Sequence, residues 1–351
     1  MFDSPVKPMA NPTATIEHLN GENFSVSRLK NRFLSLDIAP DLGGKIISLR
    51  SGPALQTEWL WKSERTPYQP AQLDHSYTRQ HDTGGIDECF PSVDACELPA
   101  NAGDWASLTL PDHGELYGRP WTHQESAVHS DGTAILTLRQ LCQTLPLTFE
   151  RRLVLAPDSG TLWFEYRVEN LSDNPIPFSW CMHPALAITP GMQLRLPDNH
   201  QLYCSYASDN APLTTGDQFR WPLTPNGTDI SVIPDPDTTN GYATKLLSHQ
   251  DLLDCTSGNS PAIAGLENPA TGEALHFVLP PSEVPHIALW LNYRGWAGDG
   301  GAPYFNLVLE PAIGNADSLR ELLDRETAPA VPPHASHSWS FEVHATTPDL
   351  C

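Results

Sequence analysis

Alternation of apolar and charged residues is the feature that most constrains how this chain folds. Between residues 162 and 169, every second residue is apolar (Leu162, Phe164, Tyr166 and Val168), and three of the intervening residues are charged (Glu165, Arg167 and Glu169). Successive side chains of a β-strand point to opposite faces, so this pattern buries one face and exposes the other. It predicts a half-buried strand of an antiparallel sheet.

The flanking segments continue the pattern. Apolar residues alternate along 147–155, and a Pro, Asp and Gly segment at 156–160 reads as a hairpin turn to the next strand. A second turn at 171–175 leads to apolar residues at alternate positions from Ile176 to Trp180. We therefore predict a meander of three sequential strands that ends near His183.

Strand signals extend from near the start of the chain to near its end. Alternating apolar residues recur in 34–38, 305–309 and 339–343. Only 315–324 has leucines at helical spacing, with Asn315 or Asp317 as a candidate N-cap. The 34 prolines and 23 glycines fit many turns and long loops, because aromatic residues accompany them throughout.

These signals predict an all-β fold, a large antiparallel β-sandwich with one or a few short helices. All-β sandwiches of about this size fold around one continuous core. We expect a single domain over residues 1–351, with residues 1–15 as a flexible N-terminal extension.

The charge balance narrows the classes of partner. The chain has 20 Lys and Arg against 42 Asp and Glu, a formal net charge of −22. Such a balance repels nucleic acid phosphates and anionic lipid, so we expect neither nucleic acid nor a membrane as a partner, and a neutral ligand is favoured.

Nothing in the sequence has the length of a signal peptide core or a membrane helix, so we expect a cytoplasmic protein. The seven cysteines lack CxxC pairs and are interpreted as free thiols (Cys89, Cys96, Cys142, Cys181, Cys204, Cys255 and Cys351).

Two glycine-containing segments place polar residues among aromatics. Residues 84–91 contain adjacent Asp87 and Glu88, which suit contacts to sugar hydroxyls or a cation, or else form the acidic tip of a turn. Residues 112–121 combine His113 and Arg119 with two carboxylates and two aromatic rings. Planar polar groups that bond pairs of hydroxyls, beside an aromatic face, are typical of sugar sites. The alternative is a loop in which His113 only caps backbone groups.

Two strands end in residues with acid–base chemistry. His183 follows directly on a predicted strand, and Pro184 after it fixes where the imidazole points, although a structural role is also open. In 304–311, Tyr304, Asn306 and Glu310 share the face opposite the apolar residues. Glu310 closes this apolar strand and is a candidate base; capping of the following helix is the alternative.

A nearby strand, 287–293, places Trp290 and Asn292 on a common face. An aromatic ring beside an amide makes a plausible sugar platform. Core packing explains the pair equally well, since Trp is usually well buried.

Taken in this order, the segments resemble the aldose 1-epimerase family, whose fold is the galactose mutarotase-like supersandwich. The shared motifs are a Gly-Gly turn (Gly43-Gly44), a His-Gly loop before a Trp (His113-Gly114 and Trp121), a strand ending in a second histidine (His183), a Trp-x-Asn strand (Trp290 and Asn292), a strand ending Glu-Pro (Glu310-Pro311), and a short helix with a terminal strand (339–343). The match spans nearly the whole chain, and 85–91 and 112–116 are most similar to the less characterised bacterial branch.

The resemblance implies an isomerase that interconverts the α and β anomers of a free monosaccharide. It assigns Glu310 as the base that deprotonates the anomeric hydroxyl and His183 as the acid that protonates the ring oxygen. It assigns His113 to substrate binding and suggests Arg79 for the family's sugar-binding arginine. No metal and no cofactor are implied, and a monomer or homodimer is expected.

The chain departs from the better-known members at both histidines. Met182 precedes His183 where they carry Asn, and Pro184 follows it where they carry an aromatic pair. Glu115 follows Gly114 where they usually carry a second Gly. These differences leave the identity of the sugar open.

Three other readings stay open. One is a carbohydrate-binding or regulatory protein that keeps the fold without catalysis. Another is a glycoside hydrolase or lyase that uses Glu310 with Asp87 or Glu88. The third, a metal site of His75, His81 and His113, matches no standard ligand spacing.

Overall fold

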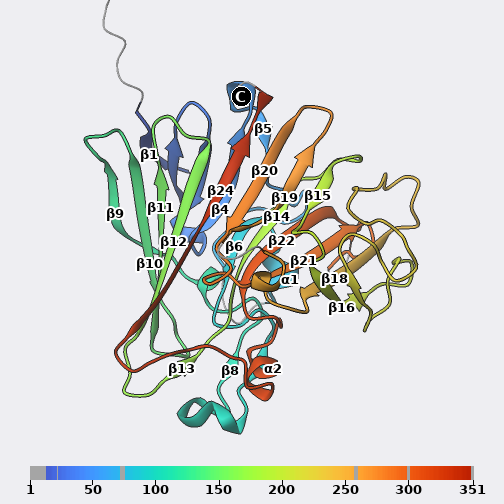
Figure 1. Ribbon diagram of the computed structural model, residues 1–351. Helices are drawn as coiled ribbons and strands as arrows, with labels where there is room; N and C mark the ends of the chain where they lie inside the picture. Colours follow the sequence, from blue (N-terminus) through green and yellow to red (C-terminus); the bar gives the residue numbers. More distant parts are fainter. Residues whose placement is uncertain (1–12, 22, 72–75, 257–259, 299–300, 349–351) are drawn as a thin grey trace, which may run out of the picture.

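Two large antiparallel sheets dominate the structure, a computed structural model that describes residues 13–21, 23–71, 76–256, 260–298 and 301–348 (Figure 1). The sheets pack face to face, as the period-two patterns predicted. The fold is an all-β sandwich.

The larger sheet has twelve strands. Its spatial order is β1 (Thr15–Asn20), β2 (Ser25–Lys30), β3 (Ser35–Ala39), β4 (Lys45–Ser51), β6 (Gly85–Cys89), β14 (Trp180–Leu186), β22 (Phe305–Ile313), β21 (His286–Tyr293), β18 (Tyr242–Ser248), β16 (Gln201–Ala207) and β17 (Gln218–Arg220), and β5 (Thr57–Glu58) pairs with β4. Segments far apart in the sequence thus become neighbours at its centre, where β14 lies between β6 and β22.

The smaller sheet has eight strands. Its spatial order is β15 (Gln193–Arg195), β19 (Ala262–Asn268), β20 (Glu273–Leu279), β24 (Ser336–Thr346), β12 (Thr161–Asn170), β11 (Leu147–Leu155), β10 (Ala134–Leu141) and β9 (Thr122–Val128). In Figure 1 the red C-terminal β24 lies between the orange β20 and the green β12. The predicted hairpin of β11 and β12 is confirmed, with Leu155 opposite Leu162 beside the turn.

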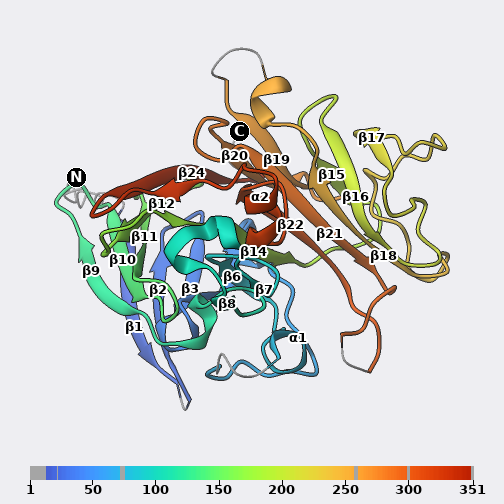
Figure 2. The same cartoon turned by 90° about the horizontal axis from the view of Figure 1, so that it is seen from below.

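The remaining elements are short. Two further strand pairs join β7 (Cys96–Glu97) to β8 (Thr109–Leu110) and β13 (Ile176–Pro177) to β23 (Ala330–Val331). The helices of the described residues are α1 (Tyr77–Gln80), α2 (Leu319–Asp324) and the 3-10 turns η1 (Pro40–Leu42), η2 (Pro53–Leu55), η3 (Ala100–Trp105), η4 (Leu116–Gly118) and η5 (Leu252–Asp254). Seen from below, η3 in teal lies beside the red α2, where Asn101 donates a hydrogen bond to the Leu323 carbonyl (Figure 2).

The predicted three-strand meander is wrong in its third strand. The free edge of β12 is taken by β24, which pairs with it from Thr161 to Glu169. The chain after β12 therefore makes only the two-residue β13, which contains Pro177, and crosses to the other sheet as β14. This crossing carries His183 to the centre of the larger sheet.

The predicted helix is present but begins later than expected. Its N-cap is Ser318, not Asn315 or Asp317. The carboxylate of Asp317 points instead to Lys245, with 3.2 Å between Oδ1 and Nζ.

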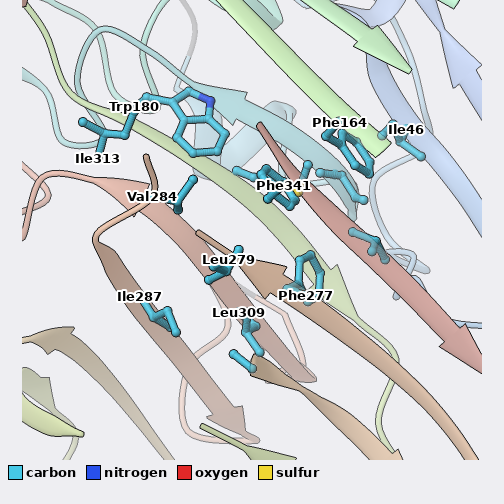
Figure 3. Packing of buried hydrophobic residues seen from close by; sticks show 14 of the residues in the cluster. Ile46, Phe164, Trp180, Phe277, Leu279, Val284, Ile287, Leu309, Ile313 and Phe341 are labelled. Atoms are coloured by element: carbon cyan, nitrogen blue, oxygen red, sulfur yellow. The ribbon is translucent and has the colours of Figure 1, made fainter. Parts of the chain in front are cut away.

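The space between the sheets is filled by interlocking apolar side chains (Figure 3). Phe164 and Phe341 of the smaller sheet stack at 5.2 Å between ring centroids, and Trp180 and Leu309 of the larger sheet are fully buried. Burial of such large side chains is the main stabilising contribution to the fold. This packed core fixes the position of the larger sheet, and therefore of the side chains on the sheet's opposite face.

The chain ends and the cysteines can also be compared with what the sequence predicted. Residues 1–12 of the expected extension lie outside the described residues, whereas Ala14 is buried and donates its amide to the Gly132 carbonyl. Six cysteines are free thiols, and Cys351 lies outside the described part of the chain. Each helix within the described ranges is too short or too polar to cross a bilayer.

Candidate active site

A cavity of about 480 Å³ lies on the face of the larger sheet that points away from the sandwich core. Strand phase explains its floor. Along β22, Leu307 and Leu309 point into the core, so Asn306, Val308 and Glu310 point into the cavity, as the alternation predicted.

Glu310 is the most deeply buried charged group of this cavity. It is 0% exposed, and its Oε2 accepts a hydrogen bond of 2.6 Å from Nζ of Lys245. Its Oε1 has no hydrogen-bond partner in the described structure, and Nε2 of His183 lies 3.7 Å from it. Because β22 continues through Pro311 to Ile313, Glu310 does not cap the following helix. One oxygen of the carboxylate is therefore held and the other is available.

Lys245 was not among the residues predicted from sequence. It lies on β18, and its ammonium contacts both Glu310 and Asp317. Burial alone would lower the pKa of Lys245, but the two carboxylates outweigh this effect and raise it, so the side chain stays charged. A lone lysine in the apolar stretch 242–248 is the signal that points to it.

His183 lies on β14, directly opposite Asp87 of β6. Its pKa is well below the usual value for histidine because the ring is buried and lies near His113 and Lys245. His183 is therefore neutral in the resting site at pH 7.

His113 reaches the same cavity from an unusual backbone conformation. Its φ is +60° and that of Gly114 is +72°, and a Cβ on Gly114 would lie 2.2 Å from the Phe90 carbonyl oxygen. Gly114 is thus needed for the loop to pack against Phe90, which directly follows β6. The His113 ring stacks on Tyr77 at 3.7 Å and lies 5.1 Å from the His183 ring.

The pKa values of the two histidines are shifted in opposite directions. Burial acts to lower the pKa of His113, but Asp112, whose Oδ1 is 3.0 Å from Nδ1, and further carboxylates raise it above the usual value. His113 thus holds its proton to higher pH than an ordinary histidine, and His183 loses its proton at lower pH.

Asp87, predicted to bind substrate, lies beneath the cavity and does not line it. It is 3% exposed, and its Oδ2 accepts hydrogen bonds from Lys45 and from the Tyr77 hydroxyl, the latter at 2.6 Å. Asp87 therefore supports Tyr77, which in turn stacks under His113. Tyr77 lies on α1, which the sequence analysis did not predict.

Glu88, the neighbour of Asp87, points to the opposite face of the sheet. It accepts hydrogen bonds of 2.9 Å each from Arg151, the Tyr166 hydroxyl and the Trp180 ring nitrogen. All of these groups are buried between the two sheets. Glu88 is therefore remote from the cavity and from Glu310.

An aromatic wall faces the acid–base groups. Successive ring centroids of Tyr206, Trp290, Trp296 and Tyr304 are 5.6 to 5.8 Å apart. Trp290 lines the cavity, and its role as a sugar platform stays a prediction. Asn292 does not line the cavity: it accepts bonds from the amides of Gly295 and Trp296 and donates to the Trp296 carbonyl, so it holds the turn that presents Trp296.

The two predicted arginines lie away from these groups. Arg79 is exposed on α1 and Arg119 is exposed after η4, and neither lines the cavity. Their assigned contacts with substrate stay predictions. His75 of the alternative metal site lies outside the described residues, and His81 is buried against Tyr117 at 5.5 Å between ring centroids.

Solved structures share this arrangement of sheets. A galactose mutarotase-like protein from Clostridium acetobutylicum aligns over 95% of this chain and 99% of its own, with a TM-score of 0.64 and 16% identity. A proposed aldose 1-epimerase from Klebsiella pneumoniae subsp. pneumoniae aligns over 96% and 84%, with a TM-score of 0.70 and 12% identity. The chain has the galactose mutarotase-like fold.

The mutarotase-like fold is also found in a protein from Synechocystis sp. PCC 6803, which aligns over 99% of this chain and 100% of its own, with a TM-score of 0.61 and 19% identity. No family model and no curated protein matches the sequence. Because a mutarotase-like fold hosts more than one function, the activity must be argued from the side chains of the cavity.

Proposed function

We propose that this protein is an aldose 1-epimerase that interconverts the α and β anomers of a free aldose. The observation that carries the proposal is the unpaired Oε1 of fully buried Glu310, 3.7 Å from Nε2 of His183 in a cavity walled by aromatic rings. The anomeric hydroxyl and the ring oxygen of an aldose are both bonded to C1. Two groups this close together are placed to serve both oxygens at once.

Glu310 acts as the base. Its Oε1 removes the proton of the anomeric hydroxyl, the electron pair forms the aldehyde, and the bond from C1 to the ring oxygen breaks. Lys245 holds Oε2 throughout, which fixes the orientation of the carboxylate. Rotation about the bond from C1 to C2 and reclosure on the other face give the opposite anomer.

The leaving ring oxygen needs a proton, and the two histidines divide this task. His183 is next to Glu310 and its pKa is lowered by burial, whereas His113 is one ring away and its pKa is raised by Asp112. In our proposal His183 donates its ring N–H proton to the leaving ring oxygen and takes up the His113 proton in exchange, so that His113, paired with Asp112, is the net acid. The reverse path returns the proton on reclosure.

The unpaired Glu310 oxygen supports a ligand at this point of the cavity, because a buried acceptor without a donor costs about 1–3 kcal/mol and is retained where function needs it. The exchange measurement below separates catalysis from binding alone. The burial of Glu88 between the sheets removes it as the second carboxylate of a hydrolase.

Two-dimensional NMR exchange on D-glucose and D-galactose tests the proposal. The protein should add cross-peaks between α and β anomeric protons beyond the spontaneous rate, in proportion to its concentration. Equal rates with and without protein on a broad panel of free aldoses would refute an epimerase. Release of new reducing ends from oligosaccharides in the same samples would support the hydrolase instead.

A further inference from the structure

The charges that line the cavity do not balance. Six carboxylates line it: Asp82, Asp94, Asp112, Glu310, Asp317 and Glu321. Within the described ranges, Lys245 is the one lysine or arginine that lines the same space. The site is therefore strongly acidic, and this imbalance is informative about the substrate of the proposed function.

Pairing accounts for only part of the negative charge. Lys245 is shared by Glu310 and Asp317, His113 pairs with Asp112, and Arg325 at the surface pairs with Glu321. Asp94 has no hydrogen-bonded or ionic side-chain partner among the described residues. Asp94 is exposed to solvent where it lines the cavity, and its partial desolvation together with the nearby Asp317 raises its pKa.

A second, independent observation shows that the cavity is built for donors. Asn306 lines it and is 3% exposed, yet its Oδ1 has no hydrogen-bond partner in the described structure. The Oε1 of Glu310 also has no hydrogen-bond partner among the described residues. Both are buried acceptors, so a ligand that fills the cavity is best matched to them by N–H or O–H groups.

We infer that the preferred substrate is an amino sugar, a free aldose with a protonated amine, whose ammonium pairs with Asp94. The inference rests on the proposed function, since it names the substrate of the same site. Hydroxyls satisfy Asn306 and Glu310, the aromatic wall covers the C–H face of the ring, and the ammonium supplies the charge that the carboxylates lack. A phosphate or carboxylate on the sugar would add to the excess negative charge, so phosphorylated sugars and uronates are rejected.

The test compares D-glucosamine, D-glucose, D-glucose 6-phosphate and D-glucuronate by NMR anomer exchange with the full chain at near-neutral pH. We expect kcat/KM to fall in the order amine, neutral, anion, with about tenfold or more between the amine and neutral sugars, the worth of one hydrogen bond to a charged group. Asp94→Asn should reduce the ratio of glucosamine to glucose activity by about the same factor. Asp209→Asn, at an exposed position away from the cavity, should leave that ratio intact.

A binding titration separates failure of this inference from failure of the function. Tryptophan fluorescence, to which Trp290 and Trp296 of the cavity contribute, reports binding of a sugar whether or not the protein turns it over. If glucose is turned over and glucosamine is no better in rate or in binding, the amino sugar inference is wrong and the epimerase stands. If no sugar is turned over, the epimerase fails; tighter binding of glucosamine than of glucose would still support the amine site, and equal or weaker binding would overturn it.

Discussion

Two buried glutamates of the same sheet, Glu88 and Glu310, differ in how their carboxylates are hydrogen-bonded. Glu88 on β6 points into the sandwich core, where Arg151 and the Tyr166 hydroxyl bond one oxygen and the Trp180 ring nitrogen bonds the other. Glu310 on β22 points into the cavity, where Lys245 bonds one oxygen and nothing bonds the other. Both are almost inaccessible to solvent, at 2% and 0% exposure, so depth alone does not separate them.

The difference is in how completely the hydrogen bonds are made. Both oxygens of Glu88 are bonded to protein donors, so neither is placed to take a proton from a ligand, although burial raises the pKa of Glu88 against the opposing effect of Arg151. A carboxylate with one oxygen fixed and one free is oriented and still able to accept a proton. The comparison therefore predicts stability effects at Glu88 and catalytic effects at Glu310.

The largest effect on stability should come from Glu88→Gln. The change leaves the buried Arg151 guanidinium without its anion, and loss of one partner of a buried ion pair costs about 3–5 kcal/mol of unfolding free energy. Urea denaturation measures this loss. Glu169→Gln, which breaks a half-exposed contact with Arg139, is the matched control and should cost at most about 1 kcal/mol. Similar small losses in both variants would contradict the structural role of Glu88.

Lys245→Met should reduce anomer exchange by about 100-fold, at the lower end of the range of general acid–base effects. Without the ammonium, Glu310 and Asp317 lie together in a buried site, so one of them takes up a proton and the base is lost at neutral pH. Lys245→Arg keeps the charge and should recover part of the rate. A rate in Lys245→Met equal to that of the unaltered protein would show that Glu310 needs no fixed partner.

The pH dependence of kcat/KM should follow His113 and not His183. The pKa of His113 is raised, so the imidazolium persists beyond the usual value of about 6.5, and activity is lost as the pH rises through the folded pKa. If a resting His183 imidazolium were the donor, its lowered pKa would place this loss at lower pH. Asp112→Asn removes the carboxylate that raises the His113 pKa, so it should move the alkaline limb to lower pH. Asp173→Asn, a surface partner of His334, is the control that should leave the limb in place.

The smallest effect is expected for Tyr166→Phe. The hydroxyl is one of three donors to Glu88, and removal of a single hydrogen bond to a charged group costs about 1.5–3 kcal/mol. Thermal or urea unfolding checks this value, and the anomer exchange rate per folded molecule should not change. A fall in exchange rate would show that the residues bonded to Glu88 affect the cavity. This would contradict the separate roles of the two glutamates.

Local pattern predicted the strands and their faces well. The alternation of 304–311 placed Asn306 and Glu310 on one face, and the structure confirms this. The same logic placed β11 and β12 in a hairpin. These features depend only on neighbouring residues, which is why the sequence reveals them.

What depends on strand order across the sheet was not predictable in this way. Lys245 contacts Glu310 because β18 and β22 both flank β21, and nothing local to residues 242–248 indicates that neighbour. The β24 strand that displaces β14 from β12 is also far away in the sequence. For the same reason, Asp87 and Glu88 could not be assigned to cavity or core until the sheet was known.

The most direct test of the central claim is the rate of anomer exchange in Glu310→Gln, measured by NMR with a turned-over aldose and expressed per folded molecule. Glutamine keeps the shape and can still accept the Lys245 hydrogen bond, but it cannot take the anomeric proton. We predict a fall of about 10²–10⁴-fold with a folded protein, while Glu88→Gln keeps its rate in the fraction that remains folded. An undiminished rate in Glu310→Gln would contradict the assignment of this carboxylate as the base.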